Sequence, residues 1–107
     1  MIAVLFEADT IPEQKDRYFQ LAAELKPLLD DVEGFISIER FQSLNTPGKI
    51  LSLSWWENEE SVLAWKKNLK HQAAQSEGQK TIFSFYRIRV VQVLRDYSSE
   101  KGRYSHV

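Results

Sequence analysis

Apolar side chains occupy both faces of the segments whose residue pattern predicts β-strands. Residues 35–43 alternate with a period of two, which places Phe35 and Phe41 on one face and Ile36 and Ile38 on the other. Residues 83–97 alternate in the same way and carry apolar residues at both sets of positions. When just one face of a sheet is covered, the apolar residues lie mainly on that face. The pattern therefore predicts a sheet whose two faces are both covered.

The predicted elements follow the order β-α-β-β-α-β along the chain. They are a strand over residues 2–8, an amphipathic helix with apolar residues from Tyr18 to Val32, strands over 35–43 and 49–57, a helix that begins after Asn58, and a strand over 83–97. Asn45-Thr46-Pro47-Gly48 is a turn sequence and predicts a hairpin between the two middle strands. This order is typical of α+β, ferredoxin-like proteins, in which four antiparallel strands carry two helices on one face.

Local signals add detail to the two helices. Thr10 and Glu13 have the spacing of a capping box for the first helix, and Pro27 predicts a kink or an early end of that helix. Residues 70–83 are predicted as a short helical or irregular connection, broken at Gly78.

Two helices can cover only one face of the predicted sheet. The chain of 107 residues supplies one domain over residues 1–97 and a polar C-terminal tail over 98–107, with no further element for the second face. The simplest cover is a second copy of the chain. We therefore expect a homodimer whose protomers pack sheet to sheet.

The composition argues against several classes of function. The 14 Lys and Arg residues oppose 15 Asp and Glu residues, and the net charge of -1 gives little attraction to nucleic acid or an anionic membrane. The absence of cysteine and the wide separation of the two histidines argue against a metal centre. The apolar N-terminal run is too short for a signal peptide or a membrane span, so we expect a cytoplasmic protein.

His71 has two interpretations. It is suited to hydrogen bonding or proton transfer near neutral pH at the end of the second helix. Alternatively, it is a surface or packing histidine that contacts the last carbonyls of that helix.

Aromatic residues gather in the second half of the chain: Trp55, Trp56, Trp65, Phe83, Phe85 and Tyr86. They are suited to line a flat pocket for an aromatic ligand, or they form ordinary core. Trp55 and Trp56 are adjacent on a predicted strand and face opposite ways, so at most one of them lines a given cavity.

Four arginines project from predicted strands: Arg40, Arg87, Arg89 and Arg95. They are suited to bind an acidic or phenolate ligand, or to pair across a dimer interface with a carboxylate. The candidate carboxylates are Glu39, Glu57 and Asp96.

Short motifs follow one another in a characteristic order: Glu33-Gly34-Phe35 to Phe41, Leu51-Ser52-Leu53-Ser54-Trp55-Trp56-Glu57, Ala64-Trp65, His71 to Gln75 with Gly78, Phe83, Tyr86-Arg87-Ile88 and Arg95-Asp96-Tyr97. Together they resemble the antibiotic biosynthesis monooxygenase (ABM) family of the dimeric α/β-barrel superfamily. The resemblance implies a ferredoxin-like protomer whose sheets meet in a homodimer to form a barrel. It also implies oxygenation of electron-rich aromatics by O₂ with no bound cofactor, since an easily oxidised phenolate can itself pass an electron to O₂.

The resemblance further implies roles for individual residues. Trp65 matches a tryptophan that borders the pocket in family members. His71 falls where relatives place a His or Tyr that hydrogen-bonds the substrate. Arg87 falls close to the position on the last strand where relatives have a pocket arginine. The catalytic candidates are therefore His71, Trp65 and Arg87. The candidate pocket residues are Trp55, Phe83 and Tyr86.

The haem-degrading branch of the superfamily is a weaker match. It uses an Asn, a Trp and a later His, whereas here the first strand offers Glu7 or Ala8 and the later position falls near Gln75. The leading hypothesis is a homodimeric monooxygenase that oxidises a quinol-type small molecule with O₂. The alternatives are a non-catalytic, aromatic-binding or stress-related dimer, and haem binding through His71.

Overall fold

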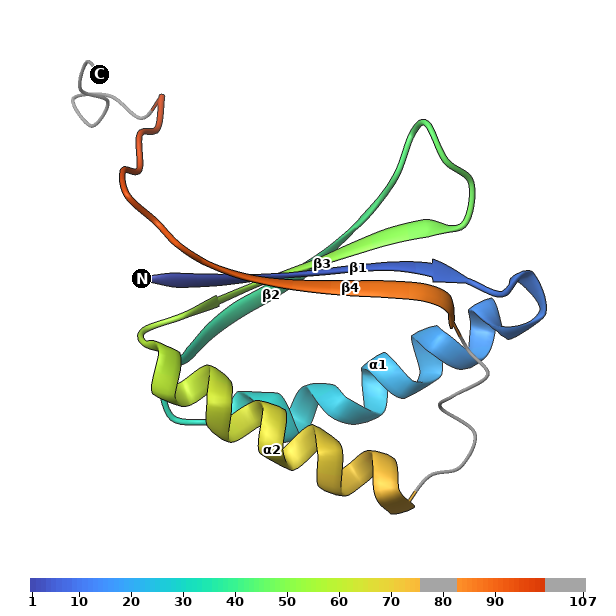
Figure 1. The fold of residues 1–107 in the computed structure, drawn as a ribbon, viewed down its shortest axis with the longest axis horizontal. Coiled ribbons are helices and arrows are strands. Elements are labelled where there is room, and N and C mark those ends of the chain that lie inside the picture. The colour runs from blue at the N-terminus through green and yellow to red at the C-terminus, as the bar shows by residue number, and fades with distance from the viewer. Residues whose placement is uncertain (76–82, 100–107) are drawn as a thin grey trace.

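The computed structural model describes the backbone of residues 1–75 and 83–99 and the side chains of residues 1–68 and 85–99. Within these ranges the elements are β1 (Ile2–Thr10), η1 (Pro12–Gln14), α1 (Lys15–Asp30), β2 (Phe35–Gln42), β3 (Lys49–Trp56), α2 (Glu59–Gln75) and β4 (Phe83–Gln92). The four strands form one antiparallel sheet in the order β2-β3-β1-β4. Both helices lie on the same side of the sheet (Figure 1). The predicted α+β, ferredoxin-like fold is confirmed.

The strand register assigns each residue to one of the two faces. Ile2 of β1 lies opposite Trp56 of β3 and Gln92 of β4, and this row faces the helices. Trp56 is 1 % exposed and packs with Leu29 of α1 and Val62 of α2 in the main core cluster. Even-numbered residues of β1, of β3 and, from Phe85 on, of β4 therefore face the helices, and the odd-numbered ones face away.

A β-bulge changes the predicted faces of β2. Phe35 pairs with Trp56 and Ser37 pairs with Trp55, so that Ile36 is an extra residue on this strand. The bulge places both Phe35 and Ile38 against the core cluster. The prediction that these two residues lie on opposite faces was wrong, because simple alternation holds only from Ser37 onward.

The beginning of α1 differs from the prediction. Thr10 is the last residue of β1, and its Oγ1 donates a hydrogen bond to the carbonyl of Gly48 at 3.0 Å. The single turn η1 precedes α1, and neither η1 nor α1 has a side-chain hydrogen bond at its N-cap. The predicted capping box is therefore wrong, since the Thr10 hydroxyl is already bonded within the sheet.

Helix α1 continues past Pro27 to Asp30, so an early end at the proline was also wrong. Proline removes one hydrogen bond to the carbonyl four residues earlier, here that of Ala23. Both Pro27 and Ala23 lie on the exposed side of the helix. Water can therefore satisfy the carbonyl, and the buried Leu29 keeps the last turn packed on the core.

Helix α2 begins as predicted. The Oδ1 of Asn58 accepts hydrogen bonds from the backbone N–H and the Oγ of Ser61, each at 2.9 Å. The helix then continues to Gln75, which is longer than predicted, whereas Gly78 lies outside the described residues.

Strand β4 ends at Gln92, five residues earlier than predicted. Its neighbour β1 begins at Ile2, and the last pairing contact is a hydrogen bond from the Val93 N–H to the Met1 carbonyl at 3.1 Å. Residues 93–99 are not assigned to a strand in the described part of the chain, so the alternation up to Tyr97 does not continue β4.

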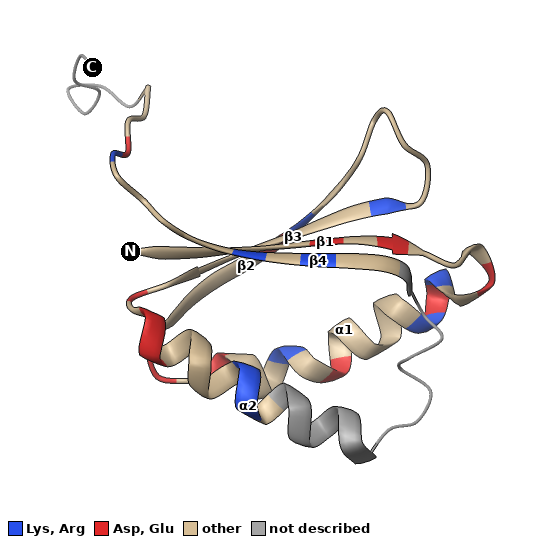
Figure 2. Ribbon diagram, viewed as in Figure 1, with Lys and Arg blue, Asp and Glu red and all other residues tan. Residues whose placement is uncertain are grey.

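Charged residues are spread over both helices and the sheet (Figure 2). In the part of the chain that the structure describes, no helix is long and apolar enough to cross a membrane.

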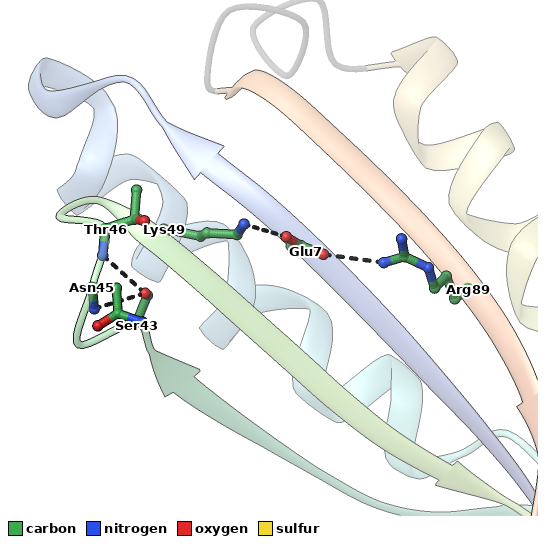
Figure 3. A network of polar contacts seen from close by, with 6 residues as sticks. All are labelled: Glu7, Ser43, Asn45, Thr46, Lys49 and Arg89. Carbon is green, nitrogen blue, oxygen red and sulfur yellow. Dashed lines mark hydrogen bonds and ion pairs between the residues drawn. The ribbon is translucent and has the colours of Figure 1, made fainter.

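The hairpin between β2 and β3 turns as predicted. The Ser43 Oγ accepts hydrogen bonds from the backbone N–H groups of Asn45 and Thr46, at 3.2 and 3.0 Å (Figure 3).

Candidate active site

The helices cover the inner strand β3 and the edge strand β4 unequally. On the helix side of β3, Ile50 is 4 % exposed and Trp56 is 1 % exposed. On the same side of β4, three neighbouring residues remain about half exposed, namely Tyr86, Ile88 and Val90. The layer of helices therefore closes over β3 and leaves an apolar surface open beneath β4.

Phe6 of β1 extends this surface toward the middle of the sheet. Its ring stacks on that of Tyr86, with the centroids 5.8 Å apart and the planes 25° from parallel. We call Phe6, Tyr86, Ile88 and Val90 the helix-side patch. Its side chains are apolar apart from the Tyr86 hydroxyl, which makes it suitable for contact with a flat hydrophobic molecule.

Trp65 lies on α2 and is partly exposed. It packs against the cluster of Leu29, Trp56 and Val62, on the same side of the sheet as the helix-side patch. Trp56 is by contrast fully part of the core, where its Nε1–H donates a hydrogen bond to the Ser54 Oγ at 2.8 Å. Of the three tryptophans, Trp65 is therefore the one that lies partly exposed on the helix side of the sheet.

The predicted site residues do not converge at one place. Trp65 and Tyr86 lie on the helix side of the sheet. Trp55 and Arg87 are odd-numbered residues of β3 and β4 and lie on the other face. The prediction that Trp55 and Trp56 face opposite ways is confirmed. His71 is within α2 and Phe83 begins β4, but their side chains lie outside the described residues.

The face away from the helices, which we call the open face, consists of odd-numbered residues: those of β1 and β3, those of β2 from Ser37 on and those of β4 from Phe85 on. Eight of its fifteen residues are apolar, and three of these, Phe41, Phe85 and Val91, are each 40 to 45 % exposed. The Arg87 guanidinium lies over the Phe85 ring, 5.6 Å from its centroid.

Three charged side chains form a network in the middle of the open face. Glu7 of β1 accepts Lys49 of β3 on one carboxylate oxygen and Arg89 of β4 on the other, at 3.2 Å for Arg89 (Figure 3). The hydrogen bond from Lys49, followed by that from Arg89, lowers the pKa of Glu7 below its usual value. This network joins three neighbouring strands. The residue pattern alone did not predict this network, although a carboxylate within the apolar run 2–8 was a signal.

Arg40 is also accounted for within the protomer. It faces the helices, and its Nε donates a hydrogen bond to the Tyr18 hydroxyl of α1 at 3.3 Å. Over the described residues, no group of three or more His, Asp or Glu side chains is placed to hold a metal ion. Among the described residues, the candidate surface for an organic ligand is the helix-side patch, which lies on the same side of the sheet as Trp65.

A four-stranded antiparallel sheet with two helices on one face defines a ferredoxin-like α+β domain, here with an exposed apolar surface on the helix side of its edge strand β4. Residues 1–77 match the antibiotic biosynthesis monooxygenase family. The chain belongs to this family, as its motifs indicated.

A curated relative is the jasmonate monooxygenase ABM of Pyricularia oryzae, which is 40 % identical over 101 residues. The alignment covers 94 % of this chain and 47 % of the relative, so the chain spans about half the length of that protein.

Solved structures confirm the fold at low sequence identity. A Deinococcus radiodurans protein superimposes with a TM-score of 0.76 and 13 % identity, covering 92 % of this chain and 97 % of that one. The haem degrader MhuD of Mycobacterium tuberculosis, solved with two haems in its active site, gives a TM-score of 0.71 and 11 % identity over 92 % of this chain and all of MhuD. At such identities the likeness extends to the fold alone.

Proposed function

We propose that this chain is a monooxygenase domain that oxidises an electron-rich aromatic or quinol-type molecule with O₂ and without a bound cofactor. The observation that carries the proposal is the helix-side patch, in which aromatic and aliphatic side chains of β4 remain about half exposed while Ile50 and Trp56 of β3 are buried on the same side. Membership of the monooxygenase family and the name of the P. oryzae relative support the reaction class.

The reaction balances without an external reductant. A hydroquinone and O₂ give a hydroxyquinone and water: one oxygen atom enters the ring and the other leaves as water. The quinol supplies all four electrons. The protein then has to hold the ring, exclude water and accept the phenolic proton, which are the tasks of an apolar surface with a few polar groups.

Two described residues have positions that suit these tasks. The Tyr86 ring, stacked on Phe6, offers a flat surface for a substrate ring, and Trp65 would border the substrate from α2. We retain His71 as the proposed proton acceptor on the strength of the family resemblance. Arg87 and Trp55 lie on the open face and are left out of the proposed catalytic site.

We also propose that the working unit is a homodimer joined through the open face. A monomer would leave Phe41, Phe85 and Val91 about 40 % or more exposed, beside the partly exposed Leu53 and Trp55. Apolar surface of this extent is typical of protein interfaces. A second sheet would cover it and would also make the protomer's sheet more rigid beneath the site.

Oxygen uptake tests the proposed reaction. The purified protein is incubated with a panel of hydroquinones, without NADH or flavin, and O₂ consumption and product mass are followed together. The proposal expects one O₂ consumed for each hydroxyquinone formed. Tight binding of the same quinols without turnover would overturn it in favour of a binding protein. A Soret band on haem titration with no quinol turnover would favour the haem alternative.

Jasmonate is a second candidate substrate, because the P. oryzae relative carries that name. Jasmonate has no phenolic ring, so its oxygenation would need another source of electrons. Including it in the panel, with and without NADPH, separates the two substrate classes. A product 16 mass units heavier than jasmonate that forms only with the reductant would assign this second class.

A further inference from the structure

One row of residues on the helix side of the sheet runs from apolar to basic. Ile88 of β4 lies opposite Phe6 of β1, and Phe6 lies opposite Ser52 of β3. Ser52 in turn lies opposite Arg40 of β2. Ile88 and Phe6 belong to the helix-side patch. The row therefore continues the patch across the sheet and ends at a positive charge.

Arg40 is held in place by a neutral group. Its Nε donates a hydrogen bond to the Tyr18 hydroxyl at 3.3 Å, and Tyr18 is itself packed in a core cluster with Ile50. No carboxylate forms an ion pair with Arg40 among the residues that the structure describes. The bond to Tyr18 uses one of the five N–H groups of the guanidinium, which leaves the two terminal nitrogens available. A guanidinium held in this way is suited to bind a carboxylate through two parallel hydrogen bonds.

Ser52 lies between the patch and Arg40. It is 7 % exposed, and its hydroxyl has no hydrogen-bond partner within the described part of the chain. Every fully enclosed side-chain nitrogen or oxygen of the described residues does have a partner, so the Ser52 hydroxyl still reaches solvent. Its neighbour Phe6 is also partly exposed, although β1 is an inner strand. The helix side is therefore accessible at Ser52 as well as at the patch.

The strand spacing sets the length of a ligand that reaches both ends of this row. Strands β1 and β2 lie on either side of β3, so at about 4.8 Å for each step their backbones are about 10 Å apart. The Arg40 side chain extends over part of this distance. The remainder suits an aromatic ring that carries an acid on a short chain, with the ring against Phe6 and the acid at Arg40.

We infer that Arg40 binds a carboxylate of the substrate, and that the preferred substrate is an acidic quinol and not a neutral one. The inference rests on the proposed function, because it places the ring on the helix-side patch, and it adds the substrate's charge. An anion beside apolar side chains is unfavourable unless a cation or hydrogen-bond donors accompany it. Arg40 supplies both, and Tyr18 is the positioning residue that orients it.

A pair of ligands that differ in charge tests the inference. They are 2,5-dihydroxyphenylacetate and its methyl ester, and calorimetric titration without oxygen at neutral pH measures their dissociation constants in the absence of turnover. The wild-type protein is expected to bind the acid about tenfold or more tightly than the ester. Arg40→Gln is expected to weaken binding of the acid about tenfold or more and to change binding of the ester less than about twofold, because charge-assisted hydrogen bonds are lost from the acid alone.

Further variants separate binding by Arg40 from general charge effects. Tyr18→Phe removes the hydroxyl that holds Arg40 and is expected to weaken binding of the acid about threefold, with the ester unchanged. Arg17→Gln is the matched control, since Arg17 is an exposed arginine of α1 that donates to Gln20 at 3.0 Å. It should change neither ligand's affinity. If Arg40→Gln fails to fold, Arg40→Lys replaces it: lysine keeps the charge but not the paired donors, and about threefold of the preference for the acid should be lost.

The outcomes distinguish this inference from the proposed function. Equal affinity of the wild type for acid and ester, or an equal loss for both in the Arg40 variant, overturns the role of Arg40, whereas oxygen uptake with the ester would leave the proposed function standing. Displacement of the aromatic acid by equimolar acetate would show an anion site that does not involve the ring, and would also overturn the inference. A preference for the acid that disappears with Arg40 supports it even if no oxygen is consumed, in which case only the proposed reaction fails.

Discussion

Gly34 packs directly against the side chain of Ser61: a β-carbon on Gly34 would lie 2.0 Å from the Ser61 Oγ. Gly34 has a φ of 90°, and its carbonyl accepts a hydrogen bond from the Glu57 N–H at 2.8 Å. The loop that leads from α1 into β2 is thereby joined to the end of β3 and to the first turn of α2. This close packing of the loop on α2 leaves no room for a β-carbon, so only glycine fits at position 34.

Replacing Gly34 is expected to be costly. Gly34→Ala combines a steric clash with a strained φ, and we expect it to lower the free energy of unfolding by about 2–4 kcal/mol. Gly48→Ala is the matched control, since Gly48 has a similar φ of 83° but nothing nearer than 3.8 Å to the added carbon. It should cost about 1–2 kcal/mol. Urea denaturation measures both, and equal losses would contradict the clash.

The Glu7 network predicts how stability depends on pH. Because Lys49 and Arg89 lower the pKa of Glu7, its contribution is complete above the usual pKa of 4.5 and is lost as the pH falls through the lower folded-state value. Glu7→Gln should therefore reduce stability at pH 7 and show a smaller difference from the wild type at pH 3. Urea denaturation of both proteins between pH 3 and 7 tests this. If the difference in free energy of unfolding between the two proteins stays constant from pH 3 to 7, the charge of the Glu7 carboxylate does not stabilise the fold.

The order of the elements could be predicted because it depends on local periodicity. Alternation in 49–56, the Asn58 cap and the turn at 45–48 each depend on neighbouring residues, and the structure agrees with them. The bulge at Ile36 could not be predicted, because an extra residue in one strand is defined only by the strand that it pairs with.

The candidate site was harder to predict for a related reason. Alternation shows that Tyr86 and Arg87 face opposite ways, but only the packed helices decide which of them lies on the helix side. Resemblance to a family assigns roles by position along the chain. It cannot show which of these residues lie on the helix side of the sheet and which lie on the open face. Phe6 was missed because it belongs to the continuous apolar run of residues 1–6, in which no position stands out, and its importance comes from the stacking on Tyr86.

The two adjacent tryptophans of β3 should respond differently to truncation. Trp56 is 1 % exposed, and Trp56→Ala should lower the free energy of unfolding by about 3–5 kcal/mol through loss of apolar burial and a cavity. Trp55 lies partly exposed on the open face. Trp55→Ala should cost the protomer less than half as much and act mainly on the dimer dissociation constant. Denaturation at low protein concentration together with sedimentation separates the two effects, and equal losses of protomer stability would contradict this assignment.

Tyr86 tests the helix-side patch as the substrate surface. Tyr86→Ser removes the ring that stacks on Phe6, and kcat/KM for quinols should fall about tenfold, corresponding to about 1.4 kcal/mol of lost contact. Tyr86→Phe keeps the ring and should retain most of the activity. Ser98→Ala, beyond the end of β4, is a control for nonspecific effects. Steady-state oxygen uptake measures all three, and wild-type activity in Tyr86→Ser would exclude the patch.

His71 is expected to be the proton acceptor of the proposed reaction. A positioned general base contributes roughly 10²–10⁴-fold, so His71→Ala should lower kcat by ~10²-fold or more while the far-ultraviolet spectrum and thermal unfolding remain as in the wild type. His106→Ala changes the chain's other histidine, in the C-terminal tail, and should leave kcat unchanged. The pH profile separates proton transfer from packing: loss of a base removes the acidic limb of the kcat profile, whereas loss of a packing residue lowers the profile without changing its shape. Unaltered turnover in a folded His71→Ala protein would mean that the substrate gives up its proton elsewhere.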